Sequence, residues 1–199
     1  VIDSLHLVST YIQGRPNGNS CTGGIAGVAY SYTPASLGKT IRNEVKIIAC
    51  SHSGTIIGGG STGSNTGGLL GQAAASGYGR GSGRGEAAII MTSCRNYADV
   101  TSGGAEFAYA GGLIGNASAL GNATGAGSGL GSIELLYSYN RGNINVLKGS
   151  AGGLIGYLNI NQVPNAIGEI KITDCYATGK ITGMAIYAGG LGGQVRQQG

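Results

Sequence analysis

The sequence predicts an all-β fold, namely a right-handed parallel β-helix (solenoid) of about four to five rungs with variable loops. Two short strings recur along the 199 residues at similar spacings, and no segment keeps the 3.6-residue period of a helix. The composition is typical of a chain that folds but turns often, because 42 glycines accompany 41% hydrophobic residues and only 10% charged ones.

The first string is Gly-Gly-(Leu/Ile)-x-Gly, and it sets the repeat. It begins at Gly23, Gly67, Gly111, Gly152 and Gly189, so its copies are 44, 44, 41 and 37 residues apart. One unit of this length cannot bury its own apolar face, whereas stacked units share a continuous core. We therefore predict one β-solenoid repeat domain over 1–199, with a partial first rung or cap at 1–22 and later repeats starting near these glycines.

The second string occupies 47–56, 91–100, 135–144 and 172–181, and its alignment defines a column of small residues. That column contains Cys50, Cys94, Ser138 and Cys175. Equivalent small residues in a stack predict a structural ladder of buried thiols. No Cys-x₂-Cys spacing indicates a metal site. A disulfide is within reach only between Cys50 and Cys94, because Cys175 lies two rungs from Cys94.

Two further columns follow the cysteine column. Asn96 and Asn140 stand two residues after it, where stacked amides can hydrogen-bond along the ladder. The turn glycines that stand four residues after it are Gly54, Gly142 and Gly179. Glycine in three of four copies predicts a positive φ and a sharp turn at this position.

Each unit is therefore predicted as a strand at the glycine string, a variable loop, a strand that ends at the cysteine column, a glycine turn and a short third strand. The longest of the variable loops are expected at 73–86 and 116–132. A fragment of a β-propeller is the alternative, because a repeat of 44 residues also fits a four-stranded blade.

The two strings together resemble the GLUG repeat. CYATGKITG at 175–183 is followed by AGGLGG at 188–193, and AGGLIG stands at 110–115 and 151–156. In that family the repeats occur in large bacterial surface proteins, including haemagglutinin-like adhesins and the non-catalytic parts of immunoglobulin A peptidases. The resemblance implies export, surface display and a spacer or adhesive role, and it supplies no catalytic residues. The chain departs from the pattern at Ser138 and Ala98.

The charge distribution argues against several partners. The formal net charge of +4 is mild and its lysines and arginines are scattered, so we expect no nucleic-acid partner. No apolar run approaches the roughly 18–20 residues that span a bilayer, so we expect no membrane insertion. The glycines at 58–63 match a dinucleotide-binding pattern only formally, since neither a helix nor a ribose-binding acid follows; no cofactor is predicted.

The acids do not indicate catalysis. The chain has eight: Asp3, Glu44, Glu86, Asp99, Glu106, Glu134, Glu169 and Asp174. Polysaccharide cleavage needs two or three carboxylates converging on one site. Glu44 and Glu169 share a column but stand three rungs apart, and no triplet emerges. We therefore predict that the protein is not an enzyme and has no catalytic residues; a glycan-active β-helical enzyme remains the alternative.

A binding surface is indicated by tyrosines and arginines near strand ends. Tyrosine with Asn, Ser and Gly is typical of adaptable binding surfaces, including those that stack on sugars. The candidate residues are Tyr78, Arg80, Arg84, Tyr139 and Tyr176. The predicted partner is a host or matrix surface (protein or glycan), and the predicted location is secreted or at the cell surface.

Copies of the chain itself are the other predicted partner. No capping helix or charged terminal strand follows the fifth glycine string, and solenoid ends expose unpaired backbone groups. The sequence therefore predicts either a piece of a longer array or a filament subunit that stacks head to tail.

Overall fold

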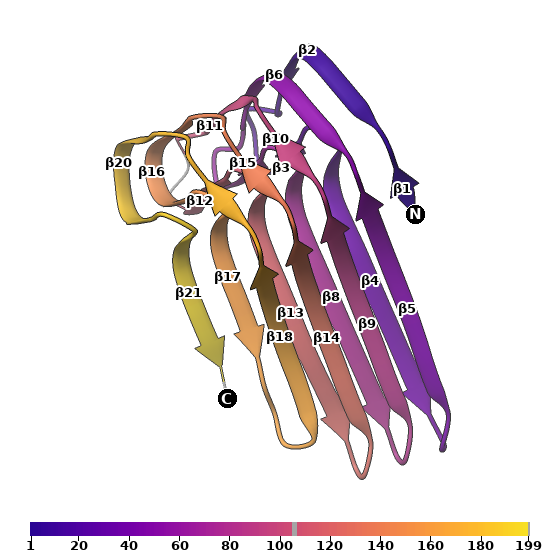
Figure 1. The fold of residues 1–199 in the computed structure, drawn as a ribbon. Coiled ribbons are helices and arrows are strands. Elements are labelled where there is room, and N and C mark those ends of the chain that lie inside the picture. Colours follow the sequence, from indigo (N-terminus) through magenta and orange to yellow (C-terminus); the bar gives the residue numbers. More distant parts are fainter. Residues whose placement is uncertain (105–106, 199) are drawn as a thin grey trace.

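A computed structural model of the chain describes residues 1–104 and 107–198, and within these residues it contains β-strands and no helix. The strands form three sheets, here named A, B and C (Figure 1). Sheet A holds β1 (Ile2–Asp3), β5 (Thr40–Ile48), β9 (Arg84–Thr92), β14 (Ser128–Leu136) and β18 (Ala166–Thr173). Sheet C holds β4 (Ala26–Ser36), β8 (Leu70–Arg80), β13 (Ile114–Thr124), β17 (Ile155–Asn161) and β21 (Gly192–Gln198). Sheet B holds β2 (His6–Gln13), β3 (Asn19–Gly23), β6 (Ser51–Ile57), β7 (Gly63–Gly67), β10 (Arg95–Asn96), β11 (Asp99–Ser102), β12 (Phe107–Gly111), β15 (Tyr139–Asn140), β16 (Ile144–Gly152), β19 (Tyr176–Ala177) and β20 (Ile181–Gly189).

Within each sheet, a strand pairs in parallel with the equivalent strand of the next repeat. The ladders join Gly23 to Gly67, Gly67 to Gly111, Gly111 to Gly152 and Gly152 to Gly189. This register is the alignment predicted from the glycine string. The fold is therefore all-β with parallel sheets. The propeller alternative is wrong, because propeller blades are built from antiparallel strands.

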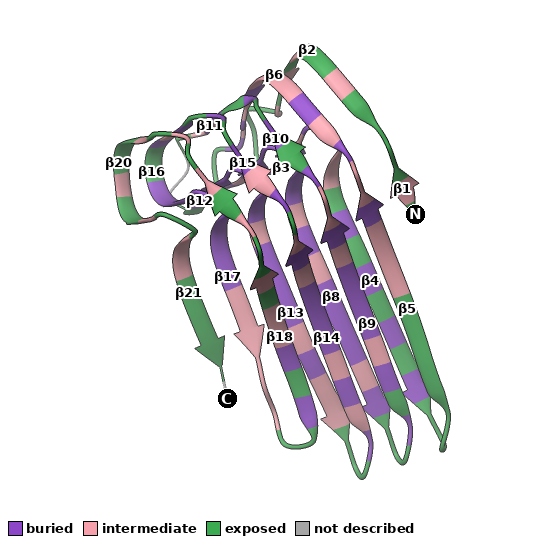
Figure 2. Cartoon of the chain, in the orientation of Figure 1, coloured by how far each residue is buried: buried purple, intermediate pink, exposed green. Residues whose placement is uncertain are grey.

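The prediction of long variable loops at 73–86 and 116–132 is wrong. Strands β8 and β9 cover most of the first segment, and β13 and β14 cover most of the second, which leaves short turns at 81–83 and 125–127. Glycines face the interior here: a Cβ on Gly77 would lie 2.5 Å from the carbonyl oxygen of Gly85. Sheets A and C therefore pack backbone against backbone, and buried residues recur along both sets of long strands (Figure 2).

Closer to the glycine strings the gap between sheets A and C is filled by larger side chains. Ile89 and Ile133 from sheet A and Leu113 and Leu154 from the glycine strings are fully buried in this core. A second, smaller core lies within sheet B and contains Val100, Ala110, Ile144, Val146 and Ala151. Stacking thus buries apolar side chains that a single repeat would leave exposed.

The left-handed corner of each repeat lies directly before the cysteine column. The residues with positive φ there are Ser4, Ala49, Ser93, Tyr137 and Asp174, with φ between 51° and 56°. Of the predicted turn glycines only Gly54 has a positive φ, of 128°. The prediction is therefore wrong for Gly142 and Gly179, which are required for space instead: a Cβ on either would collide with the carbonyl oxygen of the residue stacked next to it.

Candidate functional site

The structure places the predicted column of small residues in the interior. Cys50, Cys94 and Ser138 are buried and Cys175 is half-buried. The backbone N–H of Cys94 donates to Ser138 Oγ at 3.0 Å, and that of Ser138 donates to Cys175 Sγ at 3.4 Å. Hydrogen bonds therefore link the column from one repeat to the next. Cys50, Cys94, Cys175 and Cys21 are all free thiols.

The environment of Cys94 makes its thiol unreactive. Burial raises the pKa of Cys94 from 9.0 to about 11, and the neighbouring Cys50 thiol adds to the increase. A protonated thiol is a poor nucleophile and a poor metal ligand. In residues 1–104 and 107–198 no group of three or more His, Cys, Asp or Glu side chains is placed to hold a metal ion. The described column residues pack in the interior and are joined by hydrogen bonds between repeats.

The asparagine column connects the two repeated strings. Asn96 Nδ2 donates to Asn140 Oδ1 at 2.8 Å, and Asn140 Nδ2 donates to the carbonyl oxygen of Gly142 at 2.8 Å. Gly112, the second glycine of its string, lies against the Asn140 amide, where a Cβ would come closer than 3.0 Å. The amides and the glycines therefore recur together because they touch.

The five predicted binding residues fall into two separate places. Tyr78, Arg80 and Arg84 lie beside the turn at 81–83, at the far end of the long strands. There the Tyr78 hydroxyl lies 3.1 Å from a threonine hydroxyl of the next repeat, and Arg84 pairs with a glutamate of its own strand at 2.5 Å. Tyr139 and Tyr176 lie in sheet B, where their rings stack.

The acids that share a column are separated as the alignment predicts. In the ladder of sheet A, Ala88 and Ser132 lie between Glu44 and Glu169. A hydrogen bond from the neighbouring lysine side chain lowers the pKa of Glu44. Glu106 lies outside the residues that the structure describes.

A different set of acids comes together on the outer face of sheet A. Glu86, Glu134 and Glu169 line one depression of about 110 Å³, a grouping that the alignment does not indicate. Arg84 lies 2.5 Å from Glu86, and Lys171 lies 3.1 Å from Glu169.

A groove runs along the stack in the described structure, and sequence reasoning did not identify it. It runs between two rows of outward side chains that flank the glycine strings. The first row is Cys21, Asn65, Tyr109, Ser150 and Tyr187. The second row is Gln72, Asn116, Tyr157 and Gln194. Two cavities of about 290 and 410 Å³ lie along these rows and share Phe107 and Tyr109. A third, of about 420 Å³, adjoins the first of them at Asn19, Ser20 and Cys21, so we treat the three as one side groove.

One half of the side groove is aromatic. The rings of Tyr109 and Tyr157 stack at 4.5 Å with an interplanar angle of 14°. Phe107 and Tyr187 complete the wall of the 410 Å³ cavity and are 63% and 51% exposed, so their ring faces are open to a ligand. Burial raises the pKa of Tyr109, with a further contribution from Tyr157, which keeps the hydroxyl protonated as a donor.

The other half of the side groove is lined by amides. Asn65 and Gln72 contact the Cys21 thiol from two sides, each at 3.5 Å. Asn116 Oδ1 is buried and has no hydrogen-bond partner in the structure. A buried acceptor without a partner costs free energy unless a ligand or water satisfies it. At the aromatic end, Gln194 accepts a hydrogen bond from Ser150 Oγ at 3.1 Å.

The charges of the side groove are few. Arg15 and Arg196 line its two ends, and among the described residues that line the three cavities there is no carboxylate. The surface therefore offers ring faces, amides and hydroxyls, with a weakly positive potential.

No family model, no curated protein and no solved structure matches this chain. The similarity to GLUG repeats rests on the two repeated strings alone. Within the residues that the structure describes there is no helix of the length and apolarity needed to cross a bilayer.

Proposed function

We propose that the chain is a right-handed parallel β-solenoid acting as a non-catalytic structural and adhesive module of a secreted or cell-surface protein, and that its side groove binds a glycan. Parallel pairing of equivalent strands over successive repeats supports the solenoid. The resemblance to GLUG repeats supports the location and the adhesive role.

The lining of the side groove carries the glycan proposal. A sugar ring has an apolar C–H face and a rim of hydroxyl groups, so it is bound well by aromatic faces combined with amide donors and acceptors. The groove supplies both, with Phe107 and Tyr187 at one end and Asn65, Gln72 and Asn116 at the other. The rows lie on paired strands, which hold the side chains in place and lower the entropy lost on binding.

A glycan-active enzyme is the weaker alternative. Its chemistry would belong in the depression lined by Glu86, Glu134 and Glu169. Glycoside hydrolysis needs one carboxyl group that stays protonated to act as the acid. Two of the three glutamates, Glu86 and Glu169, are instead held in ion pairs with Arg84 and Lys171.

The test is a binding screen followed by two variants of the side groove. The purified chain is applied to a glycan and matrix-protein array and then titrated calorimetrically with the soluble form of the glycan that it retains. Tyr187→Ala and Gln194→Ala remove one open ring and one amide from the aromatic cavity. Each should weaken binding about tenfold, since one well-placed contact contributes about 1–2 kcal/mol.

Tyr32→Ala is the matched control. Tyr32 is 45% exposed and lines none of the three cavities, so its removal should leave the affinity unchanged. The proposal fails if the array retains no glycan, or if both groove variants bind as well as the wild type.

Self-association into a head-to-tail filament stays a prediction. Sedimentation velocity over a hundredfold range of concentration checks it, because a strictly monomeric species throughout would rule it out.

A further inference from the structure

A second cluster of aromatic and basic side chains lies in sheet B, apart from the side groove. It consists of Arg95, Tyr97, Tyr139, Arg141 and Tyr176, here named the tyrosine–arginine patch. Arg95, Tyr139 and Tyr176 occupy equivalent positions in β10, β15 and β19 and are paired along the ladder. None of the five lines a cavity of the side groove.

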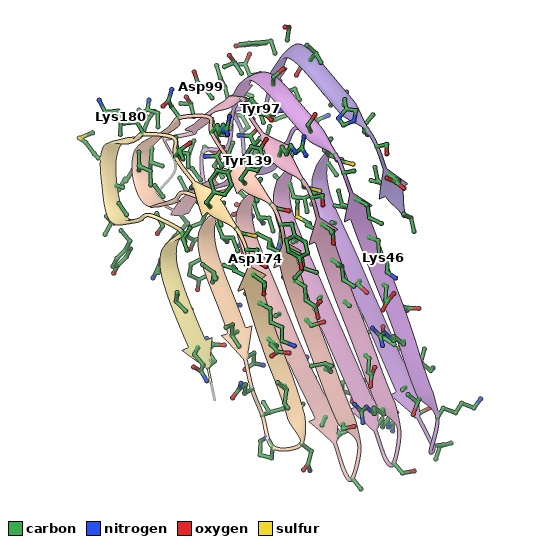
Figure 3. All side chains as sticks on the ribbon, in the orientation of Figure 1. Lys46, Tyr97, Asp99, Tyr139, Asp174 and Lys180 are labelled. Carbon is green, nitrogen blue, oxygen red and sulfur yellow. The ribbon has the colours of Figure 1, made fainter. Side chains whose placement is uncertain are left out.

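The tyrosines of the patch form a continuous row. The rings of Tyr139 and Tyr176 stack at 4.8 Å with an interplanar angle of 11°, and Tyr97 meets Tyr139 edge to face at 5.8 Å. The hydroxyls of Tyr97 and Tyr139 are 2.5 Å apart. Figure 3 shows Tyr97 and Tyr139 next to each other on the outside of the short strands. Tyr139, in the middle of the row, is thus covered by its neighbours, whereas Tyr97 and Tyr176 are each 42% exposed.

Two exposed guanidinium groups converge on this row. The Arg95 and Arg141 guanidinium carbons lie 5.7 and 5.2 Å from the centre of the Tyr139 ring. Both distances are inside the roughly 6 Å limit of a cation–π contact. The Arg141 guanidinium also donates to the Tyr176 hydroxyl at 3.5 Å. Two like charges are thus held against one ring.

Among the described residues, no carboxylate is paired with these two arginines. The nearest acid along the chain on this side, Asp99, is already bound, since its Oδ1 accepts two hydrogen bonds from Asn143. Asp174, near the other end of the row, forms no ion pair either. An anion held between the guanidiniums would relieve their repulsion and accept charge-assisted hydrogen bonds from both.

We propose that the tyrosine–arginine patch binds the sulfate or carboxylate groups of an acidic polysaccharide, at a site separate from the side groove. Guanidinium groups match such oxyanions geometrically, and the row of hydroxyls adds donors along the stack direction for a ligand that is itself extended. Nucleic acid fits less well, because base stacking needs open ring faces and those of Tyr139 are covered. The formal net charge of +4 also favours binding of an acidic partner.

Binding of soluble dextran sulfate and of a polyuronate, measured by interferometry on the immobilised chain, tests this site. Neutral dextran is the matched ligand without charge. We expect both acidic polymers to bind, more weakly as salt rises, and neutral dextran not to bind this site. The double variant Arg95→Gln/Arg141→Gln should lose about tenfold or more in affinity, because charge-assisted hydrogen bonds contribute about 1.5–3 kcal/mol.

A second double variant, Lys39→Gln/Arg42→Gln, removes the same net charge at the far end of the long strands, where both side chains are exposed. It should keep the affinity within about twofold, because charges more than a Debye length of about 10 Å away are largely screened. An equal loss in the two double variants would show a net-charge effect and overturn the proposal. So would unchanged binding by Arg95→Gln/Arg141→Gln with a wild-type melting curve.

Polyglutamate distinguishes the class of polymer. If it binds as tightly as the two polysaccharides and depends on the same arginines, the partner is an acidic peptide and the polysaccharide assignment is wrong. The proposed function is tested independently, since Arg95→Gln/Arg141→Gln should retain the array-derived glycan that Tyr187→Ala releases.

Discussion

Replacing Gly112 by alanine should destabilise the fold strongly, because two neighbours occupy the space of the new methyl group. A Cβ built at this position would lie within 3.0 Å of the Gly153 carbonyl oxygen and of Cγ and Nδ2 of Asn140. The carbonyl belongs to the next repeat, so it cannot retreat without disturbing the parallel ladder. The Asn140 amide cannot retreat without leaving its hydrogen bonds.

The magnitude follows from these two collisions. Overpacking a close-packed interior costs about 1–3 kcal/mol. Asn140 makes three buried hydrogen bonds, to Asn96 and to the backbone of Gly142, and each contributes about 1 kcal/mol. Alanine recovers about 0.4–1 kcal/mol by restricting the unfolded chain. The net loss is about 3–5 kcal/mol, which lowers the melting temperature of a chain of this length by roughly 6–20 °C.

Thermal unfolding followed by circular dichroism, with urea titration at 25 °C, measures this loss. Gly190→Ala is the matched control, because Gly190 is the second glycine of the fifth string and a Cβ there would meet nothing within 4 Å. It should be neutral or raise the stability by up to about 1 kcal/mol. If Gly112→Ala melts within about 2 °C of the wild type, which is under 1 kcal/mol, the close approach of the two strings is refuted.

Two further outcomes concern Cys94 and Ala49. Because the pKa of Cys94 is raised from 9.0 to about 11 in the folded state, the protonated thiol stabilises the fold fully below pH 9 and this contribution is lost as the pH rises to about 11. Between pH 9 and 11 the free energy of unfolding, measured by urea titration, should therefore fall by about 3 kcal/mol more for the wild type than for Cys94→Ser. If the two proteins lost the same free energy of unfolding over this pH range, the pKa shift would be contradicted. Ala49 has a φ of 51°, so Ala49→Gly should stabilise the fold by about 0.5–1 kcal/mol, whereas Ala49→Val should cost about 2 kcal/mol. A stabilising valine in the same urea assay would refute the left-handed corner.

The sequence was sufficient to predict the register, because equivalent interior positions demand equivalent residues. Cys50 and Cys94 fill the same corner of successive repeats, and Asn96 and Asn140 bind each other there. A glycine is likewise repeated wherever the backbone of the next repeat comes too close for a side chain. Comparing the sequence with itself detects such positions directly, because the same packing constraint acts on each copy of the repeat.

The long strands could not be predicted, because their glycines are consistent with either a loop or a closely packed strand. Glycine in a strand normally weakens it and marks a turn, which is why 73–86 and 116–132 look like loops. In the structure the same glycines let sheets A and C pack at backbone distance. Only the strands of the facing sheet distinguish the two, because a Cβ on Gly77 would meet the carbonyl oxygen of Gly85 from the same repeat and that of Leu130 from the next one.

The left-handed corner was missed for a related reason. It is occupied by different residue types, among them Ala49, Ser93 and Tyr137, none of which favours a positive φ. The ladder imposes the conformation: the N–H groups of the first four corner residues each donate to the next repeat, as Ala49 does to the Thr92 carbonyl oxygen at 2.9 Å. Tertiary hydrogen bonds thus override local preference, and no local signal reports it.

The candidate binding surfaces lie where the repeats differ, and this explains why alignment did not reveal them. The position two residues before each glycine string is Asn65 in one copy, Tyr109 in the next and Ser150 in the one after. An outward side chain is not packed into the core, so the residue type at this position can differ between copies. A groove that binds a ligand specifically needs such different side chains. Repetition therefore identifies the residues that hold the stack together. The candidate partner-facing residues occupy outward positions beside a repeated string. At these positions the residue type differs from one copy to the next, and aromatic and amide side chains are common.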